Sequence, residues 1–351
     1  MSVPSSRASR IARRLPVLAL AFAAGVAVAA PPQYKATRLL TPAGGEVFAA
    51  ALDASGLACG YVPADATSNK TRAVEISSHR YLTYRALGSY TDCSGIDSAG
   101  DTVGTSTSTR GVTGGAYLRL KSGTVVDLFD GHSPYSTQAT GVNAVRTVVG
   151  YEQVDKESPY VAFAWMNGAA QALPGLGGAN ELAMAINDDG LIVGEAGTPD
   201  FLQHATTWVD GQVHDLGSIG AGGSSVAYAV SSRGWVAGQS SIEGNAAVHA
   251  ALWHDGLAID LGTLRKGNYS AATGVNASGT VVGMSAVDSR TPAHAFVWQD
   301  GAMTDLNQLA HGLAGWTLGK ALAINDAGQI LASGFDANGA SASFLLTPAR
   351  Q

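Results

Sequence analysis

Short apolar segments separated by polar, glycine-containing turns recur along the chain at nearly constant intervals. In the clearest copy, residues 272–275 lead through an Asn-x-x-Gly turn into the apolar segment 281–283. An aromatic segment, residues 294–298, follows, and a fourth segment after an Asp-Gly turn ends in Asp305 and Leu306. The segments have the lengths and the β-branched and aromatic content of strands, and they show no helical periodicity. The pattern predicts an all-β fold whose units have four short strands.

The turn between the first two segments shows the length of the repeat. Its Asn recurs, with substitutions, at steps of 44 to 49 residues, at Asp53, Asp97, Asn143, Asn187, Ser231, Asn276 and Asn325. The Gly three residues later recurs in every copy but the third, where Arg146 replaces it. In such a turn the short polar side chain caps the backbone and Gly adopts a positive φ angle. Four strands in a repeat of this length are typical of a β-propeller blade.

The two ends of the repeated region complement each other. The seventh copy is expected to stop after its third strand, because Pro348 cannot continue into a further central strand. Residues 34–41 lie where a fourth strand would precede the first copy. The sequence therefore predicts a seven-bladed β-propeller of four-stranded blades, in which the N-terminal strand closes the last blade. A parallel β-solenoid is the alternative, and it would need no such complement.

The N-terminal residues have the features of an export signal. A basic segment with Arg13 and Arg14 precedes the apolar run 15–30, which is shorter than the roughly 20 residues of a membrane span. Ala27-Val28-Ala29 fits the small-x-small cleavage rule. We expect residues 1–29 to be a signal peptide and residues 30–351 to be one propeller domain of seven repeats. The mature protein is expected to be secreted or periplasmic, without membrane insertion.

Composition narrows the classes of partner. Only 14% of residues are charged, and loss of the signal peptide removes four Arg, which takes the net charge from −6 to −10. This acidic balance argues against general nucleic-acid binding. We expect a monomer without a cofactor.

The chain has two cysteines, Cys59 and Cys93. They occupy apolar strand positions in the first and second copies, which also lack the tryptophan that later copies carry on the third strand. In an exported protein an even number of cysteines favours a disulfide. We predict a Cys59–Cys93 bond that joins the first blade to the second; the alternative is two buried thiols too far apart to bond.

The repeat resembles a known family. The His-Ala-Phe strand, the Asp-Leu pair and the Ile/Val-Asn-x-x-Gly turn are similar to the HAF repeat of bacterial extracellular proteins. The last copy, with Asp305-Leu306-Asn307, Gly315-Trp316-Thr317-Leu318 and residues 323–330, is close to the closing unit of that family. The resemblance covers roughly residues 48–346, although the first two copies lack the His and the Trp. It implies export and a repeat fold, and the family has no established reaction or catalytic residues that could be transferred to this chain.

Residues that follow the repeat are interpreted as structural. His204, His249 and His294 occupy one position in successive copies, so they are expected to lie too far apart to share a metal ion. The third-strand tryptophans recur once per copy and suit packing between blades. We therefore expect no metal site and no catalytic residue among these positions.

Departures from the repeat gather in the connections on one face. The turns between the first and second strands and between the third and fourth are short and share one face, here called the short-turn face. The longer, variable connections share the other, the long-loop face, where binding is expected. The candidate ligand-binding residues are Tyr151, Glu195, Glu152, Tyr160, Phe201, Tyr269 and Trp316, with Asp130 and His132 as further variable loop residues.

Three functions remain open. The first is an exported, non-enzymatic binding or scaffold module whose partner is an extracellular glycan or protein. The second is a polysaccharide hydrolase or lyase that uses carboxylates such as Glu152 and Glu195. The third is a structural envelope or matrix component. The scarcity of loop carboxylates favours the first.

Overall fold

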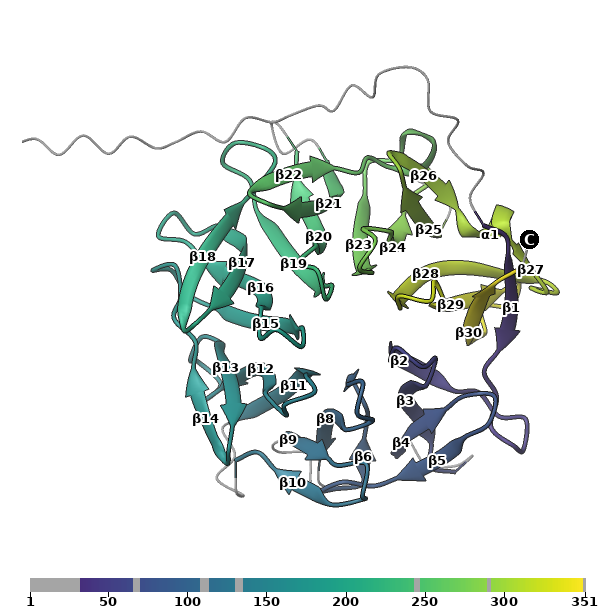
Figure 1. Ribbon diagram of the computed structural model, residues 1–351, viewed down its shortest axis with the longest axis horizontal. Coiled ribbons are helices and arrows are strands. Elements are labelled where there is room, and N and C mark those ends of the chain that lie inside the picture. Colours follow the sequence, from purple (N-terminus) through teal and green to yellow (C-terminus); the bar gives the residue numbers. More distant parts are fainter. Residues whose placement is uncertain are drawn as a thin grey trace, which may run out of the picture.

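Strands arranged in a ring make up nearly all of the regular secondary structure in the described part of the chain. The computed structural model describes residues 32–65, 70–107, 114–129, 135–242, 247–288 and 292–349. Figure 1 shows the sheets standing radially around a central axis. The strands of each sequence copy are here called a unit. No helix in this described part is long and apolar enough to cross a membrane. The expected signal peptide, residues 1–29, lies outside the described residues.

Four of the sheets contain four antiparallel strands in chain order. They are unit 3 with β11 (Ser136–Val142), β12 (Val148–Gln153), β13 (Val161–Met166) and β14 (Ala169–Ala172), and unit 4 with β15 (Glu181–Ile186), β16 (Ile192–Gly197), β17 (Gln203–Val209) and β18 (Gln212–Gly217). Unit 5 has β19 (Ser225–Val230), β20 (Val236–Ser241), β21 (Val248–His254) and β22 (Leu257–Asp260). Unit 6 has β23 (Ser270–Val275), β24 (Val281–Ser285), β25 (His294–Gln299) and β26 (Ala302–Asp305), after the 3-10 turn η2 (Leu264–Lys266).

The first two sequence copies share a nine-stranded sheet. Unit 1 comprises β2 (Phe48–Leu52), β3 (Ala58–Pro63), β4 (Thr71–Ile76) and β5 (Tyr81–Tyr84). Unit 2 comprises β7 (Gly95–Ile96), β8 (Thr102–Thr107), β9 (Gly114–Arg119) and β10 (Val125–Asp127). The short strand β6 (Tyr90–Thr91) pairs with β4 on one side and β8 on the other, and so joins the two runs.

The last sheet is closed by the N-terminal strand. Unit 7 contains β28 (Trp316–Ile324), β29 (Ile330–Asp336) and β30 (Ser341–Pro348), and β1 (Tyr34–Arg38) pairs antiparallel with β30. The predicted pairing of the N-terminal segment with the last strand is confirmed, although the strand ends at Arg38 rather than at residue 41. After the short helix α1 (Leu306–Leu309), the strand β27 (Ala310–His311) pairs with the outer edge of β1.

A bulge in the first strand explains the Val-Val-Gly pattern of the second. In unit 4 the pairing register shifts between Ala183 and Ala185, opposite Gly194. A Cβ atom on Gly194 would lie 1.9 Å from the carbonyl oxygen of Leu182, so no side chain fits there. Units 3, 5 and 6 repeat the same shift and the same close approach.

The capping residues of the turns also connect neighbouring units. Asn187 Oδ1 accepts a hydrogen bond from the backbone N–H of Leu191, which confirms its predicted capping role. Its Nδ2 donates to the carbonyl oxygen of Ser231 in the next unit, 2.9 Å away. At the seam, Asn325 Nδ2 donates to the carbonyl oxygen of Asp53 at 3.1 Å, so the last unit is linked to the first. These bonds close the ring from the short-turn face, independently of β1.

Arg146, which replaces the turn glycine in unit 3, keeps the backbone conformation of that glycine. Its φ angle is 65°, a value that L residues seldom adopt. The side chain donates from Nε to Asp101 Oδ2 of unit 2 at 2.8 Å, and this inter-unit ion pair offsets the backbone cost.

The third-strand tryptophans pack between neighbouring units, as expected. Trp208 is buried among Val149 and Ala162 of unit 3 and Ala183 and Ile192 of its own unit. Trp253 is buried in the same way between units 4 and 5. Apolar clusters between units, rather than one central core, therefore hold the ring together.

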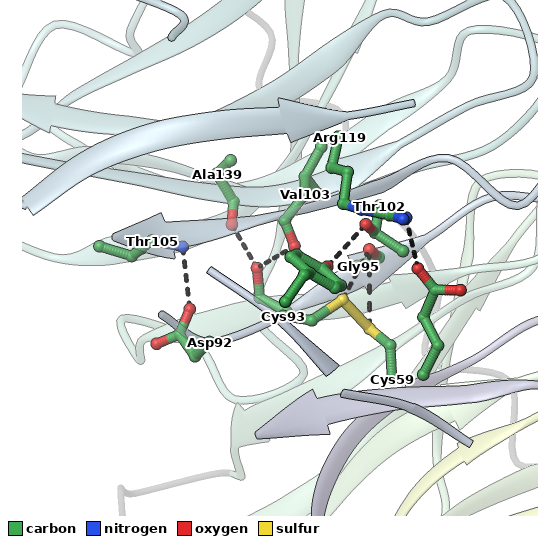
Figure 2. The surroundings of a disulfide bond; sticks show 12 residues. Cys59, Asp92, Cys93, Gly95, Thr102, Val103, Thr105, Arg119 and Ala139 are labelled. Atoms are coloured by element: carbon green, nitrogen blue, oxygen red, sulfur yellow. Dashed lines mark hydrogen bonds and ion pairs between the residues drawn. A yellow bond between two sulfur atoms is a disulfide. The ribbon is translucent and has the colours of Figure 1, made fainter. Parts of the chain in front are cut away.

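A disulfide joins units 1 and 2, as predicted. Cys59 on β3 and Cys93 just before β7 are bonded, with their Cα atoms 5.7 Å apart (Figure 2). Both are buried with Ala73 of unit 1 and Ile96 of unit 2 at this interface. The bond holds together the two units that lack the tryptophan.

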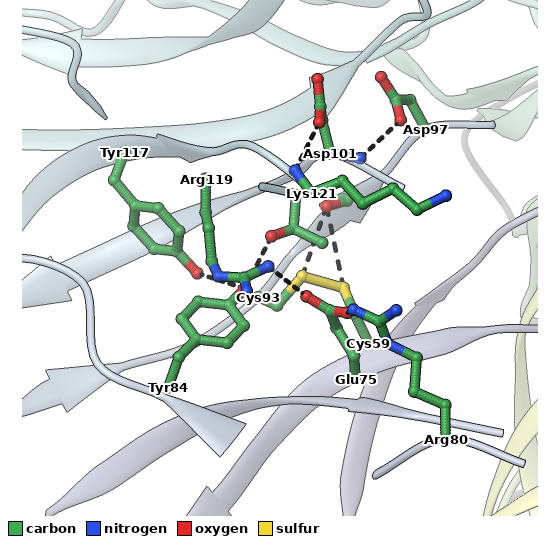
Figure 3. A network of polar contacts seen from close by, with 12 residues as sticks. Cys59, Glu75, Arg80, Tyr84, Cys93, Asp97, Asp101, Tyr117, Arg119 and Lys121 are labelled. Atoms are coloured by element: carbon green, nitrogen blue, oxygen red, sulfur yellow. Dashed lines mark hydrogen bonds and ion pairs between the residues drawn. A yellow bond between two sulfur atoms is a disulfide. The ribbon is translucent and has the colours of Figure 1, made fainter. Parts of the chain in front are cut away.

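A buried ion-pair network beside the disulfide was not foreseen from the sequence. Glu75, completely buried on β4, accepts hydrogen bonds from Arg119 of unit 2 at 2.7 Å and from Arg80 at 2.5 Å (Figure 3). The Arg119 guanidinium also lies over the ring of Tyr84, 4.4 Å from its centroid. Two guanidinium groups satisfy the carboxylate, which keeps a buried charge from being left alone.

Candidate functional site

Aromatic and polar side chains of units 3, 4 and 5 lie near the long-loop face as two contacting pairs, with Glu195 electrostatically coupled to tyrosines on both sides. The set consists of Tyr151 and Tyr160 from unit 3, Glu195 from unit 4, Tyr228 and Gln239 from unit 5, and Tyr269 from the connection that follows unit 5. We call this set the tyrosine–glutamate band. Four of the sequence candidates, Tyr151, Tyr160, Glu195 and Tyr269, lie in it.

Strand alternation positions the two central members. On β12, Val148 packs toward unit 2 and Val149 packs toward unit 4. Side chains alternate along a strand, so Tyr151 points toward unit 4 like Val149. By the same reasoning, Glu195 points toward unit 5, because Val193 packs there. The residue after each Val-Val-Gly therefore faces the next unit.

Ring contacts and hydrogen bonds connect the rest of the band. The rings of Tyr151 and Tyr160 meet edge to face with their centroids 5.4 Å apart. Tyr151 Oη donates a hydrogen bond to Gln138 Oε1 on the neighbouring first strand. At the other end, Tyr269 Oη donates to Gln239 Oε1 at 3.1 Å. The side chains are thus held in place before any ligand binds.

Partial burial makes Glu195 the electrostatic centre of the band. Burial raises the pKa of the Glu195 carboxyl above its ordinary value. Burial also raises the pKa of Tyr151, with smaller contributions from Tyr160 and Glu195. Burial, then Tyr269 and Glu195, raise the pKa of Tyr228 to about 12. Two phenols that stay protonated thus flank one desolvated carboxyl, and both kinds of group hydrogen-bond well to hydroxyl-rich ligands.

Glu152 is separated from Glu195. It follows Tyr151 on β12 and therefore points back toward unit 2, like Val148, whereas Glu195 points toward unit 5. Burial raises the pKa of Glu152 as well. The sheets of units 3 and 4 stand between the two carboxyls, so the paired-carboxylate arrangement of a glycosidase does not form from these residues.

Phe201 stands alone on the long-loop face. It lies in the turn between β16 and β17, its backbone N–H bonded to the Thr198 carbonyl, and 98% of its surface is exposed. Its φ angle of 62° is in the left-handed region. A fully exposed aromatic ring on the turn that follows the Glu195 strand is available for contact with a ligand.

Trp316 lies outside the band, in unit 7. It begins β28 and packs against Phe344 with the ring centroids 5.6 Å apart, while Arg38 of β1 covers the ring at 4.5 Å from its centroid. These contacts hold the closing strand to the last unit. The further loop candidates Asp130 and His132 lie outside the described residues.

The recurrent histidines each pair with the carboxylate of the Asp-Leu motif. His204, His249 and His294 contact Asp215, Asp260 and Asp305 through Nδ1 at 2.9, 2.9 and 2.7 Å. Each pair lies within one unit, on the third strand and at the end of the fourth. Across the described ranges, no three His, Cys, Asp or Glu side chains gather as a metal site would require. His204 also has a backbone hydrogen bond to Gly223, in the connection to unit 5.

A cavity of about 290 Å³ opens elsewhere, on the short-turn face between units 1 and 2. Its lining includes Asp53, Leu57, Ser77, Arg80 and Lys121. From the sequence, binding was expected on the long-loop face, and this cavity was not identified. Tyr228 was also not identified from the sequence. It lies on β19, the first strand of unit 5, and the other residues of that strand follow the repeat.

Comparison with known proteins shows the fold alone. No protein-family model matches the chain, and no curated protein matches it. Among solved structures, the chain is similar to the β-propeller domain of the Trilobed protease from Pyrococcus furiosus, which is described as having an open velcro topology. That match has a TM-score of 0.53 at 9% identity and covers 89% of this chain and 95% of that one.

A second similarity, to TolB from Acinetobacter baumannii, has a TM-score of 0.42 at 14% identity and covers 86% of this chain and 66% of that one. It is too distant to carry an argument. The radial sheets and the first similarity together show that this chain is an all-β protein with the β-propeller fold.

Proposed function

We propose that the protein is an exported, seven-bladed β-propeller that binds an extracellular glycan on its long-loop face. The blade number follows if the nine-stranded sheet is two blades whose edges meet at β6, with unit 7 closed by β1. The His–Asp pairs give the His-Ala-Phe and Asp-Leu motifs a shared structural role, and this supports membership of the HAF-repeat family as part of the proposal.

Export is supported by two independent features. The first is the signal-like sequence of residues 1–29. The second is the buried Cys59–Cys93 disulfide, because such bonds persist in oxidising compartments. Secreted and periplasmic locations both fit these features.

The observation that carries the binding proposal is the tyrosine–glutamate band. Glycan sites combine aromatic rings that stack on sugar faces with polar groups that hydrogen-bond to hydroxyls, and Tyr151, Glu195 and Gln239 supply both kinds of group. Exposed Phe201 adds an aromatic contact at the rim. The band is fixed by its own contacts, so little ordering entropy is lost on binding.

Binding is favoured over hydrolysis by the positions of the carboxyls. Glu152 and Glu195 face different neighbouring units, so they do not flank a common bond. A protein partner on the same face and a purely structural role are the remaining alternatives.

The experiment is to apply the mature, disulfide-bonded protein to an array of immobilised polysaccharides. We expect retention on at least one acidic or neutral polysaccharide without release of reducing ends or unsaturated products. Release of such products would instead establish a hydrolase or lyase. Absence of retention on every polysaccharide would overturn the glycan proposal.

A further inference from the structure

The cavity between units 1 and 2 is bounded by turns of both units. The capping turn and the third-to-fourth-strand turn of unit 1 contribute Asp53, Ser55, Leu57, Ser77 and Arg80. Unit 2 contributes Ser98, Ala99, Gly100 and Lys121. Its volume of about 290 Å³ is close to the lower limit of small-molecule sites, which suits a ligand of monosaccharide size.

The corresponding space between units 5 and 6 is filled by aromatic side chains. Trp235, at the repeat position of Leu57, stacks on His254, at the repeat position of Ser77, with ring centroids 3.7 Å apart. A Cβ atom on Gly279, the counterpart of Gly100, would lie 3.2 Å from the Trp235 ring. The repeat therefore accommodates two stacked aromatic side chains in this space, and the interface between units 1 and 2 has none there.

The carboxylate that lines the cavity already has partners. The Asp53 carboxylate accepts from the backbone N–H groups of Ser55 and Leu57, each at 2.8 Å. Glu75, below the cavity, is neutralised by two guanidinium groups. Asp97, next to Ser98, has one buried carboxylate oxygen, Oδ2, without a hydrogen-bond partner in the described residues, but Asp97 is not one of the residues that line the cavity.

Donors, by contrast, are left over. Arg80 Nε is buried and has no hydrogen-bond partner in the described part of the chain. The Lys121 ammonium and the Ser98 hydroxyl also make no bond within these residues, while the backbone N–H of Lys121 is held by Asp101. A buried unpartnered donor is costly, so the group that completes this site is an acceptor. The ammonium group of Lys121, which makes no ion pair within the described residues, favours an acceptor that is negatively charged.

We propose that this cavity binds a monosaccharide-sized ligand that carries a carboxylate or another oxyanion, with Lys121 and Arg80 contacting the charged group and Ser98 a hydroxyl. This site is separate from the tyrosine–glutamate band and does not depend on glycan binding there.

Titration calorimetry of the mature, disulfide-bonded protein with glucuronate tests the proposal, with glucose as the uncharged counterpart and sulfate as the bare oxyanion. We expect saturable binding of glucuronate, at least about tenfold weaker binding of glucose, and competition between sulfate and glucuronate. Added salt should weaken the binding of glucuronate. Equal affinity for glucose, or no binding of glucuronate, would overturn the proposal.

Two variants locate the site. Lys121→Met removes the ammonium group but keeps most of the stem that runs along Gly100, and it should weaken glucuronate binding about tenfold or more. Lys156→Met, at an exposed lysine of unit 3, is the matched control and should bind as the wild type does. The double variant Leu57→Trp/Ser77→His should fill the cavity as Trp235 and His254 do and abolish binding. Wild-type affinity in Lys121→Met would refute the assignment even if the double variant fails to fold.

Discussion

Closure of the ring by the N-terminal strand can be tested at one side chain. Tyr34, the first residue of β1, is 2% exposed and packs in the cluster that contains Leu306, Phe344 and Leu346. Burial raises its pKa to about 12, as expected for a phenol withdrawn from water. The next residue, Lys35, lies in the same strand with its side chain exposed.

Tyr34→Ala should lower the free energy of unfolding by about 3 kcal/mol, the usual cost of truncating a large buried aromatic residue. Lys35→Ala keeps the backbone pairing with β30 and should change the free energy by less than about 0.5 kcal/mol. Urea unfolding followed by tryptophan fluorescence measures both.

Hydrogen exchange of the amides of β30 provides a second measurement. Opening of the seam in Tyr34→Ala should speed exchange in β30 more than in β20 of unit 5, because β30 pairs with β1 and β20 does not. Equal urea midpoints for the two variants, with unchanged exchange in β30, would refute closure by this strand.

Three further outcomes follow from the packing. Replacing Cys59 and Cys93 by Ala should cost about 3 to 4 kcal/mol for a bond that spans 34 residues, and thiol titration of the denatured, unreduced wild type should find no free thiol. Gly194→Ala should be strongly destabilising in the same unfolding assay, because the added Cβ meets a carbonyl oxygen. Gly141→Ala, where the closest contacts of the added Cβ are at 3.4 Å, should be nearly neutral. Similar losses of unfolding free energy in the two variants would disprove the bulge argument. The hydrogen bond to its aspartate partner raises the pKa of His204 above 6.5, so its contribution to stability is present at acidic pH and is lost as the pH rises through the raised value. The stability difference between the wild type and His204→Asn should therefore shrink from mildly acidic to mildly alkaline pH, and a constant difference would contradict this.

Local features of the fold were predictable because each is specified within one repeat. The Asn-x-x-Gly turns cap themselves through side chains such as that of Asn187, and the strand positions follow from the same short patterns. The Cys59–Cys93 bond could be predicted because the two residues occupy known repeat positions in adjacent units.

Features between units were not predictable, because they depend on how one unit is placed against the next. The bond from Asn187 to Ser231 and the pairing of Arg119 with Glu75 join residues whose separation the repeat pattern does not specify. The cavity near Lys121 likewise arises because Leu57 and Ser77 are smaller than Trp235 and His254, which fill the corresponding space between units 5 and 6.

The candidate site was predicted in part. The variable position after Val-Val-Gly places Tyr151 and Glu195 in one band, since strand alternation directs both side chains toward the next unit, and their role in binding stays a prediction. The same alternation separates Glu152, which neighbours Tyr151 in sequence. Variable positions in the sequence do not show toward which neighbouring unit a side chain points. That direction becomes known only when the neighbours of each strand are known.

The most direct test of the central claim compares the two faces of the propeller. The affinity for the polysaccharide retained on the array is measured for the double variant Tyr151→Ala/Glu195→Gln and for Ser232→Ala/Arg233→Ala, which lies in a capping turn of the short-turn face of unit 5. Loss of a ring that stacks on the sugar and of a carboxylate that hydrogen-bonds to its hydroxyls should weaken binding at least about tenfold in the first variant, and binding should be unchanged in the second. Equal affinities of the two variants would contradict binding at the tyrosine–glutamate band.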